Sequence, residues 1–132
     1  MKKLFFTFVL LVCMSESTQA QVARNLTFMD NKTDSLDLSL QADVVEISLQ
    51  VFKYKHLKYL NLSVSDFDIL PKEIGRLTNL VYLDLSMSKF TTLPKEMAKL
   101  KKLRILDLRQ NRLNDGEILK ISKMLPKCEI LF

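Results

Sequence analysis

The sequence predicts a single α/β solenoid, with a short parallel sheet on its concave side and short helical or irregular returns on its convex side. Two observations predict this fold class. Rows of 23 residues repeat along the chain, and each row opens with leucines at the spacing of a strand that buries one of its faces. Each complete row then passes through a Leu-Pro pair into apolar residues three positions apart, which is the spacing of a short helical return.

Two complete rows and the start of a third carry the repeat. They read LKYLNLSVSDFDILPKEIGRLTN at residues 57–79, LVYLDLSMSKFTTLPKEMAKLKK at 80–102 and LRILDLRQNRL at 103–113. The apolar pairs that align beyond the strand are Phe67 with Phe90, Leu70 with Leu93, Ile74 with Met97, and Leu77 with Leu100. Because a single row cannot bury its own leucines, we expect stacked rows to share one continuous apolar interior.

Each row is expected to begin with a strand and to return through a short helix. In LDLS, Leu83 and Leu85 point to one side and Asp84 to the other, which is the alternation of a strand. Pro71 and Pro94 lack an amide donor and have a restricted φ, so each ends a turn immediately before PKEIGRL or PKEMAKL.

The register L-x-x-L-x-L-x-x-N-x-L, followed by LP-x-x-I/M-x-x-L, resembles the leucine-rich repeat family in a short bacterial-type form. The resemblance covers about residues 35–132. Ser65 and Ser88 stand where the family pattern has asparagine, and Asn111 keeps it. A hydroxyl group makes one hydrogen bond to the turn backbone and not the full set, so we expect looser turns than the family norm.

The first coil, residues 35–56, is predicted to be degenerate and one residue short. Leu38 and Leu40 take its strand positions, and Val51 and Tyr54 belong to its return. Irregular terminal coils are usual in solenoids.

The last coil, residues 103–124, follows coils 57–79 and 80–102 and lengthens its helix to DGEILKISKM. A closing strand, residues 125–132, is expected to repeat the strand spacing with Leu125, Cys128, Ile130 and Phe132. Cys128 is then most simply a small buried apolar side chain, with a reactive thiol as the alternative. Because exposed sheet edges at the ends of so short a solenoid would be adhesive, we expect marginal stability or self-association through an end.

Residues 1–20 have the organisation of a secretory signal peptide. Lys2 and Lys3 precede the apolar run LFFTFVLLV, and a polar stretch then ends at Ala20. The run is shorter than the ~20 apolar residues that a membrane-spanning helix requires. We therefore expect a secreted, periplasmic or cell-envelope protein, in which residues 21–34 form a flexible lead-in or an N-terminal cap.

An alternative destination is the membrane surface. Cys13 directly follows the apolar run, where a bacterial lipoprotein carries its lipid, although Val12 is larger than the residue usual before such a cysteine. Segment 95–104, KEMAKLKKLR, is strongly basic and would either attract anionic groups or form a solvated outer face. The alternative function is therefore a lipid-anchored or anion-associating envelope structural protein that uses Cys13 or this basic face.

The composition argues against catalysis and against metal or cofactor binding. The chain of 132 residues has a net charge of +5, one histidine and two cysteines, too few soft ligands for a four-ligand zinc site. It has no nucleophile–base pair and no Gly-rich phosphate loop. We expect no enzyme activity, no cofactor and no metal, and, because the chain is predicted to be exported, no nucleic-acid partner.

The residues between the strand leucines are predicted to face the concave surface, in rows that run across the sheet. The first row is Asp37, Tyr59, Tyr82, Ile105 and Lys127; the second is Ser39, Asn61, Asp84, Asp107 and Glu129; the third is Gln41, Ser63, Ser86, Arg109 and Leu131. The second row would stack three carboxylates, at 84, 107 and 129. These would hold a divalent cation or meet a basic partner, or they would be solvated and neutralised by Arg109 and Lys127.

The family resemblance implies that such a surface recognises another macromolecule, most often a protein. An open sheet offers no closed pocket to shift the pKa values of paired carboxylates, which argues against hydrolysis. The tyrosines are of a residue type enriched at protein interfaces. The residues that we predict to contact a protein partner are Tyr59, Asn61, Tyr82, Asp84, Ile105, Asp107 and Arg109.

Overall fold

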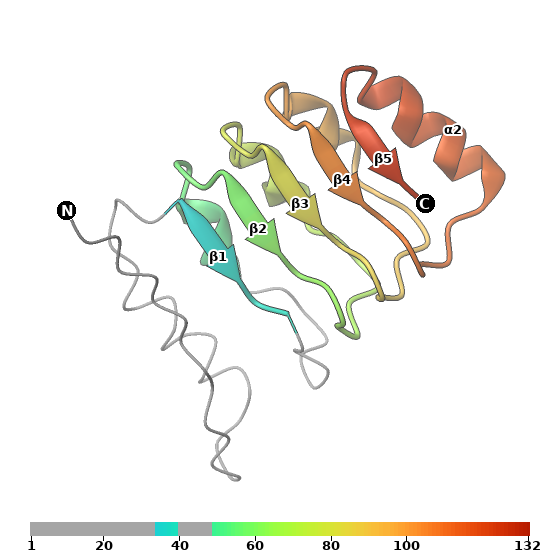
Figure 1. Ribbon diagram of the computed structural model, residues 1–132, viewed down its shortest axis with the longest axis horizontal. Helices are drawn as coiled ribbons and strands as arrows, with labels where there is room; N and C mark the ends of the chain where they lie inside the picture. The colour runs from blue at the N-terminus through green and yellow to red at the C-terminus, as the bar shows by residue number, and fades with distance from the viewer. Residues whose placement is uncertain (1–33, 40–48) are drawn as a thin grey trace, which may run out of the picture.

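The computed structural model describes residues 34–39 and 49–132. The predicted signal peptide with Cys13, the lead-in as far as residue 33, and residues 40–48 lie outside the described residues. In the described part, a parallel five-stranded sheet has a layer of short helices on one face (Figure 1).

The strands are three residues long and follow one another across the sheet in chain order. They are β1 (Ser35–Asp37), β2 (Tyr59–Asn61), β3 (Tyr82–Asp84), β4 (Ile105–Asp107) and β5 (Glu129–Leu131). The returns are the 3-10 helices η1 (Val51–Lys53), η2 (Lys72–Arg76) and η3 (Lys95–Lys99), and the α-helix α2 (Asp115–Met124). This is the predicted α/β solenoid, and its sheet is open.

The core lies between the sheet and the returns. Leu60, Leu83 and Leu106 are fully buried at the strand centres, and the strand register places them side by side. Ile74 and Met97 are fully buried on the return side of the same cluster. Burying a side chain of this size stabilises by about 1.5–3 kcal/mol, so contacts between stacked coils, and not the three-residue strands themselves, hold the fold together.

Proline begins the returns as predicted. Pro71 is extended, with φ −61° and ψ 143°, and its carbonyl oxygen accepts the Ile74 N–H at 3.0 Å. The Ile74 carbonyl oxygen then accepts the Leu77 N–H at 3.0 Å, and the next coil repeats both bonds after Pro94. Because the bonds join residues three apart, these returns are 3-10 helices.

The first coil differs from the predicted register. Leu36 lies opposite Leu60, and Leu36 and Leu38 are the buried residues, so the prediction that Leu38 and Leu40 hold these positions is wrong. The chain from Leu36 to Leu60 is one residue longer than that from Leu60 to Leu83, and not one residue shorter. A shift of two residues keeps every leucine on the same face of a strand, so SLDLSL fits both registers until stacking on β2 selects one.

The closing strand is also shifted by two residues. Ile130 lies opposite Leu106, where the sequence predicted Cys128. The Cys128 N–H instead donates to the Leu125 carbonyl oxygen at 3.1 Å, as the equivalent N–H does before β2, β3 and β4. The longer return through α2 therefore delays entry into the sheet.

The lengthened helix of the last coil is confirmed. α2 is the predicted DGEILKISKM segment, and the Asn114 side-chain oxygen caps it by accepting the Glu117 N–H at 2.9 Å. Ile121 is fully buried, whereas Leu119 is 57% exposed. The apolar stripe of α2 is thus wider than the face that packs on the core. Among the described residues, no helix is long and apolar enough to cross a membrane.

Candidate binding face

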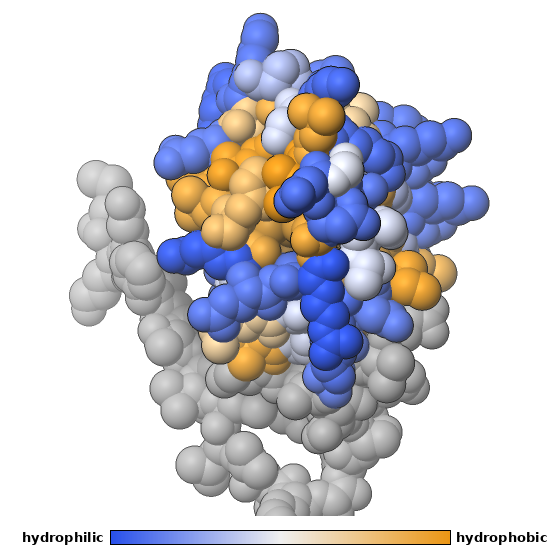
Figure 2. Space-filling model, turned by 90° about the vertical axis from the view of Figure 1, so that its right-hand side faces the viewer, coloured by the Kyte–Doolittle hydropathy of each residue, from blue (hydrophilic) through white to orange (hydrophobic). Residues whose placement is uncertain are grey.

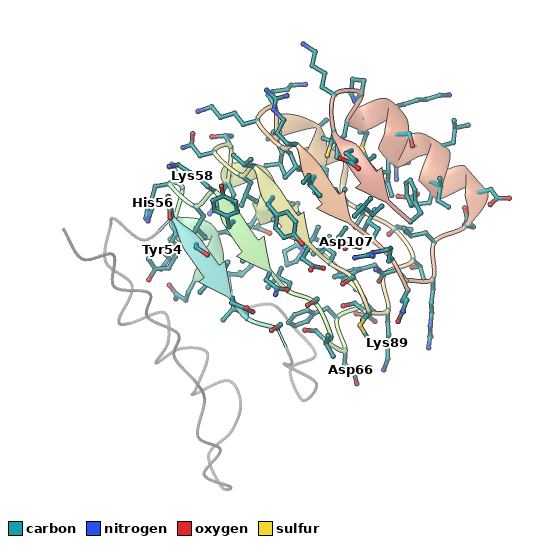
Figure 3. The ribbon with its side chains drawn as sticks, in the orientation of Figure 1. Tyr54, His56, Lys58, Asp66, Lys89 and Asp107 are labelled. Atoms are coloured by element: carbon teal, nitrogen blue, oxygen red, sulfur yellow. The ribbon has the colours of Figure 1, made fainter. Side chains whose placement is uncertain are left out.

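The central members of the predicted concave rows lie together. The register places Tyr59 opposite Tyr82, and Tyr82 opposite Ile105. Adjacent strands are ~4.8 Å apart, so these side chains form one continuous strip across the sheet. The parallel row on the same strands is Asn61, Asp84 and Asp107. Figure 3 shows the side chains on this face, with Asp107 labelled on β4.

Both rows end differently from the prediction. The outer members are Ser35 and Glu129 in the tyrosine row, and Asp37 and Leu131 in the carboxylate row. Glu129 therefore lies beside Ile105 and not beside Asp107, so the predicted stack of three carboxylates is wrong. Within residues 34–39 and 49–132, no group of three His, Cys, Asp or Glu side chains could hold a metal ion.

The acidic row has a structural role that the sequence analysis missed. The Asp84 Oδ1 atom accepts the Ser86 N–H at 2.9 Å. Equivalent bonds from the N–H two residues further on are accepted by Asp37, Asn61 and Asp107. Such bonds shape the turn by which the chain leaves the strand. The repeated Asp/Asn at the end of each of these strands was the signal for this role.

Arg109 covers Asp107. Its Nη2 donates to Asp107 Oδ2 at 2.6 Å, and its Nε donates to both carboxylate oxygens. The Asp107 side chain is 3% exposed and that of Arg109 60% exposed. The hydrogen bonds from Arg109 hold the pKa of Asp107 below its usual value, although burial acts in the opposite direction. A partner on this face would therefore meet the guanidinium group and not the Asp107 carboxylate.

Tyr59 and Tyr82 differ in how strongly neighbouring groups fix their side chains and in how exposed they are. The Tyr82 hydroxyl donates to Asp84 Oδ2 at 3.3 Å, whereas Tyr59 is 47% exposed. Burial raises the pKa of Tyr82, and the neighbouring Asp84 carboxylate raises it further. Tyr82 is thus held in place by its neighbour, and Tyr59 is the more accessible aromatic surface.

Cys128 lacks the features of a reactive thiol, and His56 lies beside an aromatic ring. Burial and the charge of Glu129 raise the pKa of the Cys128 thiol to about 11, so the reactive thiolate is scarce at neutral pH. Cys128 packs against the core but is only half-buried, so it is less buried than predicted. His56 is half-buried and lies against Tyr54, with the ring centroids 6.1 Å apart (Figure 3).

The basic segment 95–104 lies on the outside of the solenoid. Its cations, Lys95, Lys99, Lys101, Lys102 and Arg104, are all exposed. Lys102 Nζ donates to the Asn79 side-chain oxygen at 2.7 Å, and Asn79 in turn donates to the Lys55 carbonyl oxygen at 2.9 Å. This chain of bonds ties three successive coil corners together.

Glu117 is a buried acid that sequence reasoning did not single out. It is 8% exposed, and its Oε1 accepts the Leu93 N–H at 3.0 Å and a bond from Lys120 Nζ at 3.0 Å. Burial alone would raise the pKa of Glu117, but the Leu93 N–H and Lys120 together lower it. The side chain fastens α2 to the preceding coil, and no sequence pattern marks it because its partner is a backbone group of that coil.

The stacked coils, the inward leucines and the open parallel sheet define a leucine-rich repeat domain. The model of the family described as leucine-rich repeat region matches residues 21–125. The chain belongs to the leucine-rich repeat family. No curated protein matches it.

Solved structures of this family resemble the chain. A leucine-rich repeat protein of Leptospira interrogans is 31% identical, over 77% of this chain and 38% of that chain, with a TM-score of 0.46. An internalin of Listeria monocytogenes is 17% identical over 77% and 28%, with a TM-score of 0.65. The leucine-rich repeat domain of APL1B is 21% identical over 90% and 36%, with a TM-score of 0.62. The chain thus spans about a third of the length of these structures.

Proposed function

We propose that this chain is an exported protein-binding module that contacts its partner through the concave face of the sheet. Leucine-rich repeat domains are generally protein-interaction modules, and an extended curved sheet suits a protein surface better than a small ligand. The Tyr59–Tyr82–Ile105 strip, flanked by the exposed guanidinium of Arg109, is the observation that carries the proposal.

The geometry divides the seven predicted contact residues into two groups. Tyr59, Tyr82, Ile105 and Arg109 present surface to the partner, while Asn61, Asp84 and Asp107 hold the turn backbone, Tyr82 and Arg109 in position. Tyrosine on a rigid strand offers a large amphipathic contact area at a low cost in conformational entropy. Arginine and tyrosine are also the types that most often dominate binding energy.

Affinity measurements on matched variants test this assignment. The immobilised chain captures its partner from the envelope fraction of the source organism, and the dissociation constant is then measured with purified partner. We expect Tyr59→Ala and Arg109→Ala each to weaken binding about tenfold or more, as truncation of a central contact residue does. Arg76→Ala, an exposed change on the return η2, is the control and should bind normally. If all three variants bind equally well, the concave face is not the binding face.

Export is the second half of the proposal, and the pattern of residues 1–20 supports it. We expect material recovered from outside the cytoplasm to have an intact mass that begins at Gln21. A diacylglyceryl mass that begins at Cys13 would instead support the lipid-anchored alternative.

A further inference from the structure

The C-terminal end of the solenoid presents apolar surface. β5 is an edge strand of the sheet that the described residues form. Phe132 beside it is 48% exposed, and Leu119 on α2 is 57% exposed. Met124 and Ile130 are partly buried and pack against the core at this end. Figure 2 views the molecule from this end and shows an apolar area bordered by hydrophilic side chains.

The backbone of β5 presents hydrogen-bonding groups along this edge that have no partner strand within the described part of the chain. The Glu129 N–H donates to the Arg104 carbonyl oxygen, and the Leu131 carbonyl oxygen accepts the Leu108 N–H, both at 2.8 Å. Residues 129 and 131 therefore point their polar groups toward β4. By the alternation of a strand, Ile130 points its N–H and C=O away from the sheet. An edge of this kind is a template for pairing with another strand.

The outer face of α2 carries one acidic and one basic residue, placed so that each can pair with the opposite charge of a second copy of the helix. Asp115, Leu119 and Lys123 lie four residues apart along one side of the helix and are all exposed. Neither Asp115 nor Lys123 forms an ion pair with another residue in the described part of the chain. If two copies of α2 pack antiparallel with Leu119 at the centre, Asp115 of each copy lies opposite Lys123 of the other.

A single two-fold axis serves both contacts. α2 leads into the turn that joins it to β5, and β5 then leads back, so the two elements are antiparallel and lie on the same side of the turn (Figure 1). Leu119 lies ~7.5 Å along α2 from this turn at 1.5 Å per residue, and Ile130 lies roughly 7 Å along β5 from it at 3.3 Å per residue. The centres of the helix contact and the strand contact are thus at a similar height.

We propose that two copies of this chain associate through β5 and α2 about this axis. The two β5 strands pair antiparallel, Ile130 exchanges both backbone hydrogen bonds with Ile130 of the second copy, and the two sheets become one. Glu129 then stands opposite Leu131 of the second copy, so no like charges face each other directly across the strands. The contact is isologous and closes at the dimer.

Charge reversal tests the pairing of the helices. In sedimentation equilibrium of the full purified chain, we expect a monomer–dimer equilibrium. Asp115→Lys and Lys123→Glu each place like charges opposite one another and should weaken the dimer about tenfold. The double variant Asp115→Lys/Lys123→Glu restores opposite charges and should recover most of the affinity. Both positions are exposed, but each reversal places an unfavourable charge at one end of α2. Circular dichroism and urea denaturation therefore check that every variant keeps the fold.

The edge strand is tested separately. Phe132→Glu should also weaken the dimer about tenfold, whereas Ile69→Glu, at the most exposed large apolar residue of the described part of the chain, should leave it unchanged. In the dimer, exchange of the Ile130 amide hydrogen should slow as protein concentration rises. A chain that stays monomeric at about 1 mM, a dimer that the double charge variant fails to recover, or an assembly larger than a dimer would overturn the proposal.

Discussion

Individual polar side chains at the strand ends serve both the fold and the candidate binding face. Asp84 accepts the Ser86 N–H with one carboxylate oxygen and the Tyr82 hydroxyl with the other. Asp107 accepts the Arg109 N–H and is then covered by the Arg109 guanidinium. Removing either carboxylate would therefore disturb a turn as well as a contact residue, so alanine at Asp84 or Asp107 does not report on binding alone.

Glu117 gives the clearest prediction at the scale of one residue. Glu117→Ala leaves the Leu93 N–H without its acceptor, so we expect a loss of about 1–3 kcal/mol in the free energy of unfolding at neutral pH. Glu117→Gln keeps an acceptor oxygen for Leu93 but loses the charge that Lys120 meets, so its loss should be smaller. Urea denaturation of the three proteins measures both values.

The same carboxylate makes stability depend on pH. Because the folded-state pKa of Glu117 is lowered, its ionised form stabilises the fold fully above the unfolded-state pKa, and this contribution is lost as the pH falls through the folded-state pKa. The stability difference between the wild type and Glu117→Gln should therefore be constant at neutral pH and shrink below about pH 4.5. A difference that grows on acidification would contradict the assignment.

At the scale of the elements, the returns η2 and η3 pack closely against each other at Gly75. A Cβ atom at this position would lie 2.9 Å from both the Cβ and the carbonyl oxygen of Glu96. Alanine usually stabilises a helical position relative to glycine, but here it would push neighbouring coils apart. We expect Gly75→Ala to destabilise the protein by about 1–3 kcal/mol, as measured by urea denaturation.

Gly116→Ala is the matched control for Gly75→Ala. It lies in the first turn of α2 and is exposed. An added Cβ would meet the Asn114 side-chain oxygen at 3.2 Å, so this oxygen would have to move by only a few tenths of an ångström while keeping its bond to the Glu117 N–H. We expect a change of no more than about 0.5 kcal/mol, and equal effects of the two alanines would contradict close stacking at Gly75.

The turn after each strand depends on which polar residue occupies it. Asn111 accepts the Phe90 N–H and donates to the carbonyl oxygens of Leu85 and Leu108. Ser88 makes one bond, to the Ser86 carbonyl oxygen at 3.2 Å, as the single hydroxyl led us to expect. Asparagine therefore ties adjacent coils together where serine acts within its own coil.

Ser88→Asn should accordingly stabilise the solenoid. In the same register, its amide would reach the backbone of the preceding coil, where the Phe67 N–H corresponds to the Phe90 N–H. We expect a gain of about 1 kcal/mol and slower hydrogen exchange of the Phe67 amide. Asn111→Ser is the reverse change and should cost about 1–3 kcal/mol; a gain in stability there would show that the ladder does not hold the coils together.

At the scale of the whole molecule, stability is the sum of contacts between neighbouring coils. Leu83 is fully buried between Leu60 and Leu106, so Leu83→Ala weakens both of its interfaces. We expect a loss of about 2–5 kcal/mol, a large share of the stability of a domain of this size. Ile69→Ala, at an exposed position, should change the free energy of unfolding by less than about 0.5 kcal/mol. Differential scanning calorimetry of both variants measures these changes.

Much of the fold was predictable because the repeat is local. The leucine spacing, the Leu-Pro pair and the apolar positions of the returns placed Leu60, Leu83, Ile74 and Met97 in the core, and these residues are buried. The central concave rows followed from the same alternation. The contacts of Glu117 and the clash at Gly75 could not be predicted, because each involves a backbone group of another coil.

The sequence by itself determined the coil repeat, the inward face of every central strand and the outward position of Tyr59, Tyr82 and Arg109. Side chains alternate along a strand, and the central rows have a fixed length, so only one alignment of these strands buries all their leucines. The tertiary structure decided the register of the two end coils and the state of the carboxylate row. A two-residue shift keeps the same face buried, so only stacking on β2 and β4 could select between registers. That choice removed Glu129 from the acidic row, and the local turns and Arg109 then engaged the carboxylates that remained.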